Sequence, residues 1–264
     1  MSKKNKESTS WEGISTWYDK AVGDEGHYYH KHVIIPKLLP LLIPSEMNSP
    51  KALLDLACGQ GILSRHIPSS LEYVGIDISP SLLQAAKEKN INKNCSFHLG
   101  DITKPLPIGK KKFQLCTIIL ALQNIAHPLK ALQNAAASLE NEGELILVMN
   151  HPCFRIPKQS SWGIDQENNI QYRRIDKYTS SYKVPIQSNP GLGKKSPETF
   201  SFHHPLSTWS LWLNNAGFTI SWMEEWCSDK ISTGKYAQRE DESRREIPLF
   251  LMIKARKLPP SLNG

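Results

Sequence analysis

Between residues 51 and 150, short apolar runs of strand length alternate with runs in which apolar residues recur at helical spacing. The predicted strands are residues 52–57, 72–76, 95–99, 113–121 and 144–149, and the predicted helices are residues 62–67, 79–89 and 128–139. Ser79 and Pro80 are typical of a helix N-cap and first position, and a turn at 141–143 is expected before the fifth strand. Near-continuous apolar strands separated by helices predict a doubly wound α/β domain with a parallel sheet.

The end of the chain adds two predicted strands to this sheet. Residues 205–215 favour a helix that ends at Gly217, and residues 218–223 and 247–255 favour strands. The charged stretch between these strands, 228–246, is poor in apolar residues and is predicted to be a loop. Two strands joined by one loop favour an antiparallel hairpin added to the parallel sheet.

Residues 151–204 interrupt the pattern, because prolines, serines and charged residues are mixed there with aromatic ones and no period is sustained. A long segment of this kind is typical of a functional insertion such as a lid; a structural cap on the sheet is the alternative. The predicted organisation is an N-terminal segment (1–50), a core (51–150), the insertion after the fifth strand (151–204) and a C-terminal completion of the same domain (205–258).

Composition and charge narrow the class of protein. Apolar residues make up 39% and charged residues 22%, which excludes a disordered chain. No run reaches the roughly 18 apolar residues of a membrane span, and the first ten residues lack the core of a secretory signal, so we expect a cytoplasmic protein without stable membrane insertion. The five cysteines are scattered, which predicts neither disulfides nor a metal site. The net charge of +7 is not concentrated, so most of it is expected to be solvated surface.

Small residues form the turn after the first strand, in the stretch LLDLACGQGILSRH. Asp55 lies near the end of this strand, and Ala57, Gly59 and Gly61 follow it. Such a crevice, with free N–H groups of the next helix, is where open α/β sheets bind ligands. The dinucleotide fingerprint has a third glycine where this chain has Ser64. By itself the turn is compatible with a dinucleotide, another adenosine ligand or a purely structural role.

Acidic residues also end the next two predicted strands. Asp77 follows Asp55 at close to the roughly 20-residue offset at which an acid in these folds binds a ribose. Asp101 ends the third strand, where its carboxylate could accept a hydrogen bond from an exocyclic amine. Any one of these acids could instead cap a loop. Three acids at three successive strand ends favour an adenosine-type ligand.

Five motifs follow one another along the chain: LLDLACGQG, EYVGIDIS, HLGDI, ILALQNI and ENEGELILVMNHP. This series resembles that of the class I S-adenosylmethionine-dependent methyltransferases, and most of all the group of ubiquinone and menaquinone C-methyltransferases. The C-terminal strands match moderately. The resemblance implies a Rossmann-like sheet of seven strands, mostly parallel, with an antiparallel strand in the C-terminal hairpin. It implies S-adenosylmethionine as cofactor and methyl transfer as activity, and it makes a dehydrogenase the weaker interpretation.

The resemblance also implies roles for residues at the first three strand ends. Asp55 would lie near the amino-acid end of the cofactor. Asp77 would bind the ribose hydroxyls, with Ile78 against the adenine. Asp101 and Ile102 would contact the edge and the face of the adenine.

Small and apolar residues would complete the cofactor site by the same resemblance. Ala57, Gly59 and Gly61 would let the backbone approach the cofactor, and Ala121 and Leu122 would lie beside the methionyl portion and the transferable methyl. The chain lacks at that point the Asn/Asp-Pro-Pro-aromatic motif that amino-methylating enzymes acting on nucleobases or glutamine often carry, which disfavours methylation of the exocyclic amines of DNA by that mechanism.

Two flanking segments are the expected sources of acceptor contacts. Methyl transfer from a sulfonium is an in-line displacement, with a general base where the nucleophile must lose a proton. By the same resemblance, a helix in the N-terminal segment (1–50) would form a cap that closes over the cofactor. Tyr18 and Tyr29 in this segment are candidates for cofactor or substrate contact, with packing as the alternative. His151, at the end of the fifth strand, is the candidate general base, and a loop cap is the alternative.

The insertion supplies the candidate substrate-binding cations Arg155, Arg173 and Arg174, and His204 follows just before the next helix. With the neighbouring aromatics they could clamp a carboxylate or phosphate of a planar substrate, stack on RNA, or be solvated charge. The prediction is a methyltransferase that uses S-adenosylmethionine on a small, planar or acidic molecule, by C- or O-methylation. An RNA methyltransferase and a non-catalytic regulatory protein that binds S-adenosylmethionine are the alternatives.

Overall fold

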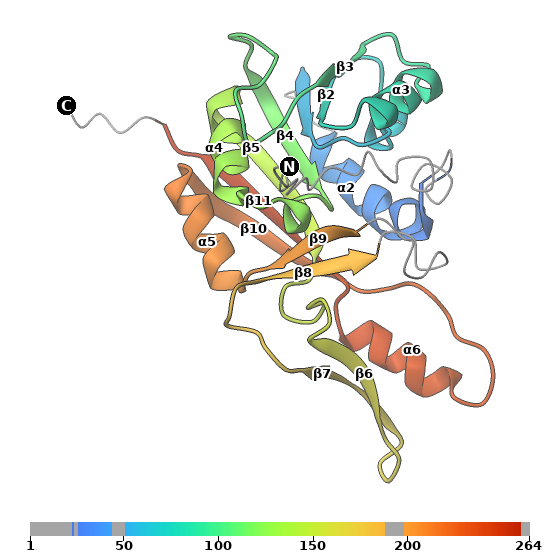
Figure 1. Cartoon of the computed structure of the whole chain (residues 1–264). Helices are drawn as coiled ribbons and strands as arrows, with labels where there is room; N and C mark the ends of the chain where they lie inside the picture. The colour runs from blue at the N-terminus through green and yellow to red at the C-terminus, as the bar shows by residue number, and fades with distance from the viewer. Residues whose placement is uncertain (1–22, 24–25, 44–50, 188–197, 260–264) are drawn as a thin grey trace, which may run out of the picture.

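A seven-stranded sheet runs through the protein, in a computed structural model that describes residues 23, 26–43, 51–187 and 198–259 (Figure 1). In spatial order its strands are β3 (Cys95–Leu99), β2 (Glu72–Asp77), β1 (Ala52–Leu56), β4 (Phe113–Ile119), β5 (Leu139–Asn150), β11 (Phe250–Lys257) and β10 (Phe218–Trp226). The pairs from β3 to β5 are parallel, and β11 is antiparallel to both of its neighbours. The predicted mostly parallel sheet with an antiparallel strand in the C-terminal hairpin is confirmed.

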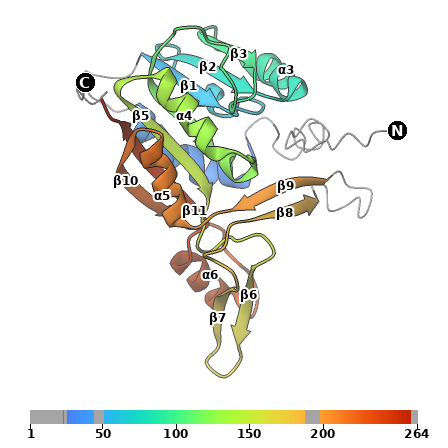
Figure 2. The same cartoon turned by 60° about the vertical axis from the view of Figure 1, so that its left-hand side comes forward.

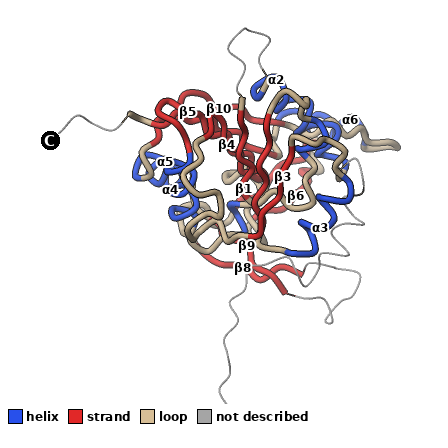
Figure 3. Tube along the Cα trace, turned by 90° about the horizontal axis from the view of Figure 1, so that it is seen from above, coloured by secondary structure: helices blue, strands red, loops and turns tan. Residues whose placement is uncertain are grey.

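Helices cover both faces of this sheet (Figure 3). One face packs against α2 (Ile35–Leu42) and α3 (Pro80–Lys89), and the other against α4 (Pro128–Ser138) and α5 (Leu206–Asn215). Residues of β1 alternate between the two cores, with Leu53 on one side and Leu54 on the other, and both are fully buried. Strand β1 is therefore apolar on both faces apart from Asp55, as strands inside a covered parallel sheet are expected to be.

Short helical turns connect some of these elements and help to shape the site. A π-helical turn, η2 (His30–Ile34), precedes α2, and 3₁₀ turns follow β1 and β4 as η3 (Leu63–His66) and η4 (Leu122–Asn124). The predicted N-cap of α3 is confirmed, because the Ser79 Oγ accepts a hydrogen bond of 3.2 Å from the Leu82 N–H.

The insertion forms two antiparallel β hairpins, which the sequence did not predict. They are β6 (Ser160–Asp165) with β7 (Ile170–Ile175), and β8 (Tyr182–Gln187) with β9 (Glu198–His203). Figure 2 shows both hairpins at one end of the main sheet. In β7 the apolar residues Ile170 and Tyr172 lie on the exposed face of the hairpin. Because the apolar residues of β7 are not the buried ones, their pattern did not predict a strand.

Two predictions, a loop at 228–246 and a turn at 141–143, were wrong in part. The stretch 228–246 contains helix α6 (Ala237–Glu246), whose buried residues are Arg239 and Ser243 rather than apolar ones. These two side chains hydrogen-bond to the β6–β7 hairpin, at Asn169 Oδ1 and at the Gln171 carbonyl, both at 2.9 Å. The predicted turn at 141–143 is an irregularity inside a longer β5, where the register with β4 shifts.

Candidate functional site

A cavity of about 740 Å³ lies at the carboxyl ends of the parallel strands, a volume typical of small-molecule sites. Its wall follows the order of the sheet, from Asp101 after β3 and Asp77 on β2 to Asn150 on β5 and Phe250 on β11. The predicted site residues on the wall are Tyr29, Ala57, Gly59, Asp77, Ile78, Asp101, Ile102 and Ala121. Most of the residues predicted for an adenosine-type ligand are therefore brought together.

The Asp77 carboxylate holds the small-residue turn in place. Its Oδ2 accepts a hydrogen bond of 2.8 Å from the Gly59 N–H, and its Oδ1 accepts one of 2.9 Å from the Ser79 N–H. Ala57 and Gly59 have φ values of 59° and 55°, in the left-handed region that costs a non-glycine residue energy. This strained, anchored backbone lies directly on the cavity wall.

Gly61 has a different function from the one predicted for the turn as a whole, since it is not among the cavity-lining residues. A Cβ atom at Gly61 would lie 3.1 Å from Ala86 Cβ on α3, and its φ is 71°. The buried Ser64, which replaces the third glycine of the dinucleotide fingerprint, donates a hydrogen bond of 2.7 Å to the Gly61 carbonyl. Gly61 thus lets the turn pack closely on α3.

Asp55 lies beneath the turn rather than on the wall of the main cavity. Its carboxylate accepts hydrogen bonds from the Tyr73 hydroxyl at 2.6 Å and from the Thr117 hydroxyl at 2.7 Å. Burial raises the pKa of Asp55 to about 6, although these two hydrogen bonds act in the opposite direction. Asp55 also lines a smaller neighbouring cavity with Ala57 and His30, which places its charge close to the turn.

Asp101 both caps its own loop and faces the cavity. Its Oδ1 accepts hydrogen bonds from the Thr103 N–H at 2.9 Å and from the Thr103 hydroxyl at 2.7 Å. Burial by itself raises the pKa of Asp101, but these bonds and the Lys104 ammonium hold the pKa below its ordinary value. The carboxylate is therefore ionised and available at this end of the site.

The segment after β4 presents a polar residue that the sequence analysis did not assign. Leu122 is 2% exposed and packs into the core, whereas Gln123 lines the cavity. The Gln123 Nε2 donates a hydrogen bond of 2.8 Å to the carbonyl of Leu120, a residue with a φ of 53°. Its Oε1 is buried and has no hydrogen-bond partner in the described part of the chain. The wall thus carries a fixed amide with an open acceptor atom.

The N-terminal segment also reaches the cavity. The Tyr29 ring lies edge-on to Phe250 at 5.6 Å between centroids, and its hydroxyl accepts a hydrogen bond of 3.3 Å from Ser228. The turn η2 brings His30 to the wall, where burial lowers its pKa to about 4 and keeps the ring neutral. Tyr18 lies outside the described residues.

His151 is not on the wall of this cavity. It is 1% exposed; its Nε2 is 2.7 Å from Glu225 Oε1 on β10, and its Nδ1 accepts a hydrogen bond of 3.2 Å from the Cys153 N–H. Burial lowers the pKa of His151, although the contact with Glu225 raises it. With both ring nitrogens engaged, His151 links the end of β5 to β10.

We therefore expect His151→Ala to lower the free energy of unfolding by about 1–3 kcal/mol, because the Cys153 N–H and the Glu225 carboxylate lose their partner. Urea denaturation measures this loss, and ligand titration should show unchanged affinity. Loss of catalytic activity at unchanged stability would contradict this structural role and support the predicted role as general base.

The predicted substrate-binding residues do not line the main cavity. Arg155 and Arg173 each place the guanidinium 5.3 Å from the centroid of the Trp162 ring. Arg174 points elsewhere, with 57% of its side chain exposed and an ion pair of 3.0 Å to Asp176. Of the four predicted residues, Arg155 and His204 line a small cavity next to the main one.

In the described ranges, no group of three or more histidine, cysteine or acidic side chains could hold a metal ion. Over the same residues, none of the helices combines the length and the apolar character that crossing a bilayer requires.

Comparisons with known proteins agree with this geometry. A family model described as a methyltransferase domain matches residues 48–179. The demethylmenaquinone methyltransferase of Paenarthrobacter aurescens is 26% identical over 199 residues, which cover 74% of this chain and 73% of that protein. The mouse 18S rRNA (guanine-N(7))-methyltransferase is 37% identical over only 77 residues, or 29% of this chain and 27% of that protein.

The fold is also found among solved structures. A crystal structure of an S-adenosylmethionine-dependent methyltransferase from Mesorhizobium loti superimposes with a TM-score of 0.64 at 23% identity. The match covers 84% of this chain and 96% of that chain.

Proposed function

Because the chain belongs to the methyltransferase-domain family and is a class I S-adenosylmethionine-dependent methyltransferase, we propose that it methylates a carbon or oxygen of a small, planar acceptor held in the main cavity. One observation carries this proposal. The cavity is continuous from the carboxylates of Asp77 and Asp101 to an apolar end lined by Ile186, Leu249 and Phe250. It therefore offers a polar end for the cofactor and an apolar end for an acceptor.

The residues of the polar end fit the cofactor. S-adenosylmethionine, when bound, would supply a methyl group on a sulfonium, whose carbon an acceptor nucleophile attacks in line while S-adenosylhomocysteine leaves. Asp77 and Asp101 would bind the ribose and the adenine edge, and the apolar side chains of Ile78 and Ile102 would face the adenine ring. Ala57 and Gly59, which have left-handed backbone conformations, line the wall with little or no side chain and so leave room for the cofactor. Ala121 is small enough to leave room beside the transferable methyl.

The apolar end would align the acceptor and exclude water from it. Phe250 and Tyr29 offer aromatic surface, which suits a planar molecule. The open Oε1 of Gln123 would accept a hydrogen bond from a hydroxyl of the acceptor, and the bond to the Leu120 carbonyl fixes the orientation of the amide. Alignment of this kind supplies a large part of the rate of a displacement reaction. The similarity to a demethylmenaquinone methyltransferase also favours a planar acceptor.

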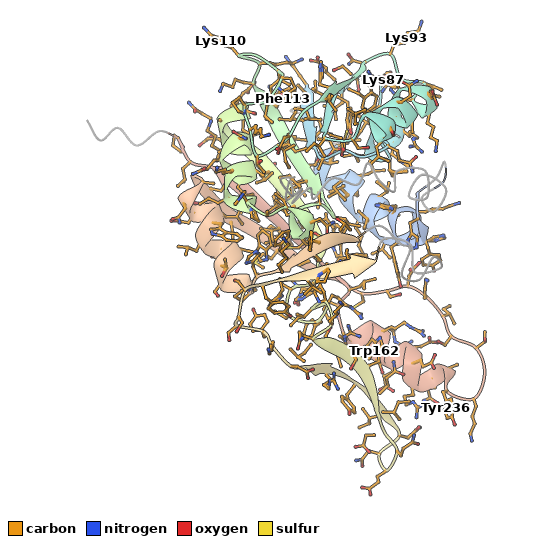
Figure 4. The ribbon with its side chains drawn as sticks, viewed as in Figure 1. Lys87, Lys93, Lys110, Phe113, Trp162 and Tyr236 are labelled. Carbon is orange, nitrogen blue, oxygen red and sulfur yellow. The ribbon has the colours of Figure 1, made fainter. Side chains whose placement is uncertain are left out.

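RNA as acceptor is the second candidate, favoured by the short match to the mouse rRNA methyltransferase and by the net charge of +7. The arrangement of cations argues against it. Trp162, whose ring carries the guanidinium groups of Arg155 and Arg173, lies in the hairpin below the main sheet. Lys87, Lys93 and Lys110 project from the opposite end of the molecule (Figure 4). RNA binding would instead need clustered cations around the cavity mouth.

Titration calorimetry with S-adenosylmethionine, S-adenosylhomocysteine and NAD tests the cofactor assignment, and we expect binding of the first two and none of NAD. A radiolabelled-methyl assay over small-molecule and RNA fractions then tests the acceptor, with label expected in small molecules. Binding of NAD alone would overturn the proposal. Label in RNA, with transfer that falls steeply as salt is raised, would support the second candidate instead.

A further inference from the structure

A small cavity of about 20 Å³ borders the main one, large enough for a single water-sized group. It shares Gln123, Asn150 and Ser201 with the wall of the main cavity, and Arg155 and His204 form part of its other wall. The small cavity therefore lies where a substituent of a molecule bound in the main cavity would reach the insertion.

Three of the side chains around this small cavity have a buried polar atom without a hydrogen-bond partner in the described part of the chain. These atoms are Gln123 Oε1, Arg155 Nε and His204 Nε2. Buried polar atoms in folded proteins are nearly always paired, because an unpaired one costs about 1–3 kcal/mol. Three of them around one small cavity indicate that a bound group completes their hydrogen bonds.

The charge at this place is positive and lacks a counter-ion. No described carboxylate lies within ion-pair distance of the half-buried Arg155, and Arg173 shares the same Trp162 ring with it. Burial, and then the neighbouring Arg173, lowers the pKa of Arg155 to about 10, so the guanidinium stays charged at neutral pH. A half-buried cation without a counter-ion is costly, and an anion bound beside it would reduce that cost.

His204 adds a neutral hydrogen-bonding group. Its ring lies among Trp209 and Trp212, with centroids 5.7 and 4.6 Å away, and burial lowers its pKa to about 4. The Nδ1 is 2.9 Å from the Ser181 hydroxyl. When that hydroxyl donates to Nδ1, the neutral ring carries its hydrogen on Nε2 and donates from there. A cation and a neutral donor are thus available to the oxygens of one anionic group.

We propose that the methyl acceptor carries a carboxylate, and that Arg155 binds this carboxylate with help from His204. The inference rests on the proposed function and names the class of its acceptor, a planar carboxylic acid. The guanidinium of Arg155 would donate a charge-assisted hydrogen bond to one oxygen of this carboxylate. A carboxylate oxygen is about the size of a water molecule, whereas a tetrahedral phosphate needs more room than the small cavity offers. The open Gln123 Oε1 would then accept from a hydroxyl near the carboxylate.

The test compares planar carboxylates, from benzoate to 2-hydroxybenzoate and the naphthoates, with their neutral carboxamides. Affinity is measured by titration calorimetry with and without S-adenosylhomocysteine. We expect at least one carboxylate to bind the wild-type protein about tenfold or more tightly than its carboxamide, as a charge-assisted hydrogen bond predicts. Arg155→Gln should abolish this preference, and Arg155→Lys should keep part of it. Arg256→Gln, which removes an exposed arginine on β11, is the matched control and should change nothing.

Thermal denaturation of each variant is the control that tests whether the variant is folded. The affinity for S-adenosylhomocysteine should be the same in all of them, and it reports on the proposed function separately from the inference. Equal binding of carboxylates and carboxamides throughout the panel would overturn the inference. A preference that survives in Arg155→Gln would also overturn it, and the small cavity would then hold only water.

Discussion

Asp77→Asn is expected to weaken the binding of S-adenosylmethionine by about 100-fold, which corresponds to about 2.7 kcal/mol. The carboxylate uses both of its oxygens, at 2.8 Å from the Gly59 nitrogen and 2.9 Å from the Ser79 nitrogen. An asparagine amide has only one acceptor oxygen, so its NH₂ group would face a backbone N–H and repel it. The turn at Gly59, with its left-handed backbone, would lose its anchor, and the proposed contact of the Asp77 carboxylate with the ribose would be weakened as well.

Asp101→Asn is the matched control for this prediction. Both hydrogen bonds from Thr103 go to Oδ1, so an amide can keep them while its NH₂ group replaces Oδ2. We expect a loss of about tenfold, since the loop keeps both hydrogen bonds and the variant loses only the charge, the contact with Lys104 and the acceptor atom proposed for the adenine edge. Calorimetric titration of both variants with S-adenosylhomocysteine gives the comparison. Equal losses would show that charge at the site, rather than the anchoring of the turn, controls affinity.

Much of the fold could be predicted because β1 and β4 are buried on both faces, so their apolar runs are nearly continuous. Asp77 and Asp101 were also predictable, since the ends of neighbouring parallel strands must meet at one edge of the sheet. The same logic placed Asp55 at this edge. The position at the strand end could not show that the hydroxyls of Tyr73 and Thr117, on the neighbouring strands β2 and β4, donate hydrogen bonds to the Asp55 carboxylate.

Other features depend on contacts that no local pattern contains. His151 is held by Glu225, on a strand that comes much later in the chain. Gln123 faces the cavity because the 3₁₀ turn η4 directs Leu122 into the core. The sequence could have indicated Gln123 as a site residue, since it directly follows Ala121 and Leu122 in the motif. Helix α6 was missed because the side chains that it buries, such as Arg239, are polar.

The stability of the protein is expected to fall as the pH rises from about 4 to about 6, through the titration of Asp55. Burial raises the pKa of this carboxyl to about 6 in the folded protein, from an ordinary value of 3.8. Between these two pH values the folded state binds more protons than the unfolded state, so the free energy of unfolding decreases as the pH rises. At about 1.4 kcal/mol per unit, the contribution lost is about 3 kcal/mol.

Asp55→Asn isolates this contribution, because the other titrating groups are the same in both proteins. Urea denaturation at pH 4, 5, 6 and 7 should show that the stability of the wild type relative to the variant falls by about 2–3 kcal/mol over the range. In Tyr73→Phe the carboxylate loses its 2.6 Å hydrogen bond, so the pKa of Asp55 should rise further, and the fall should extend to higher pH and become larger. A relative stability that stays constant or rises with pH would mean that Asp55 is ionised in the folded protein throughout. The carboxylate beneath the turn would then be a permanent charge instead of one whose ionisation is opposed by its own burial.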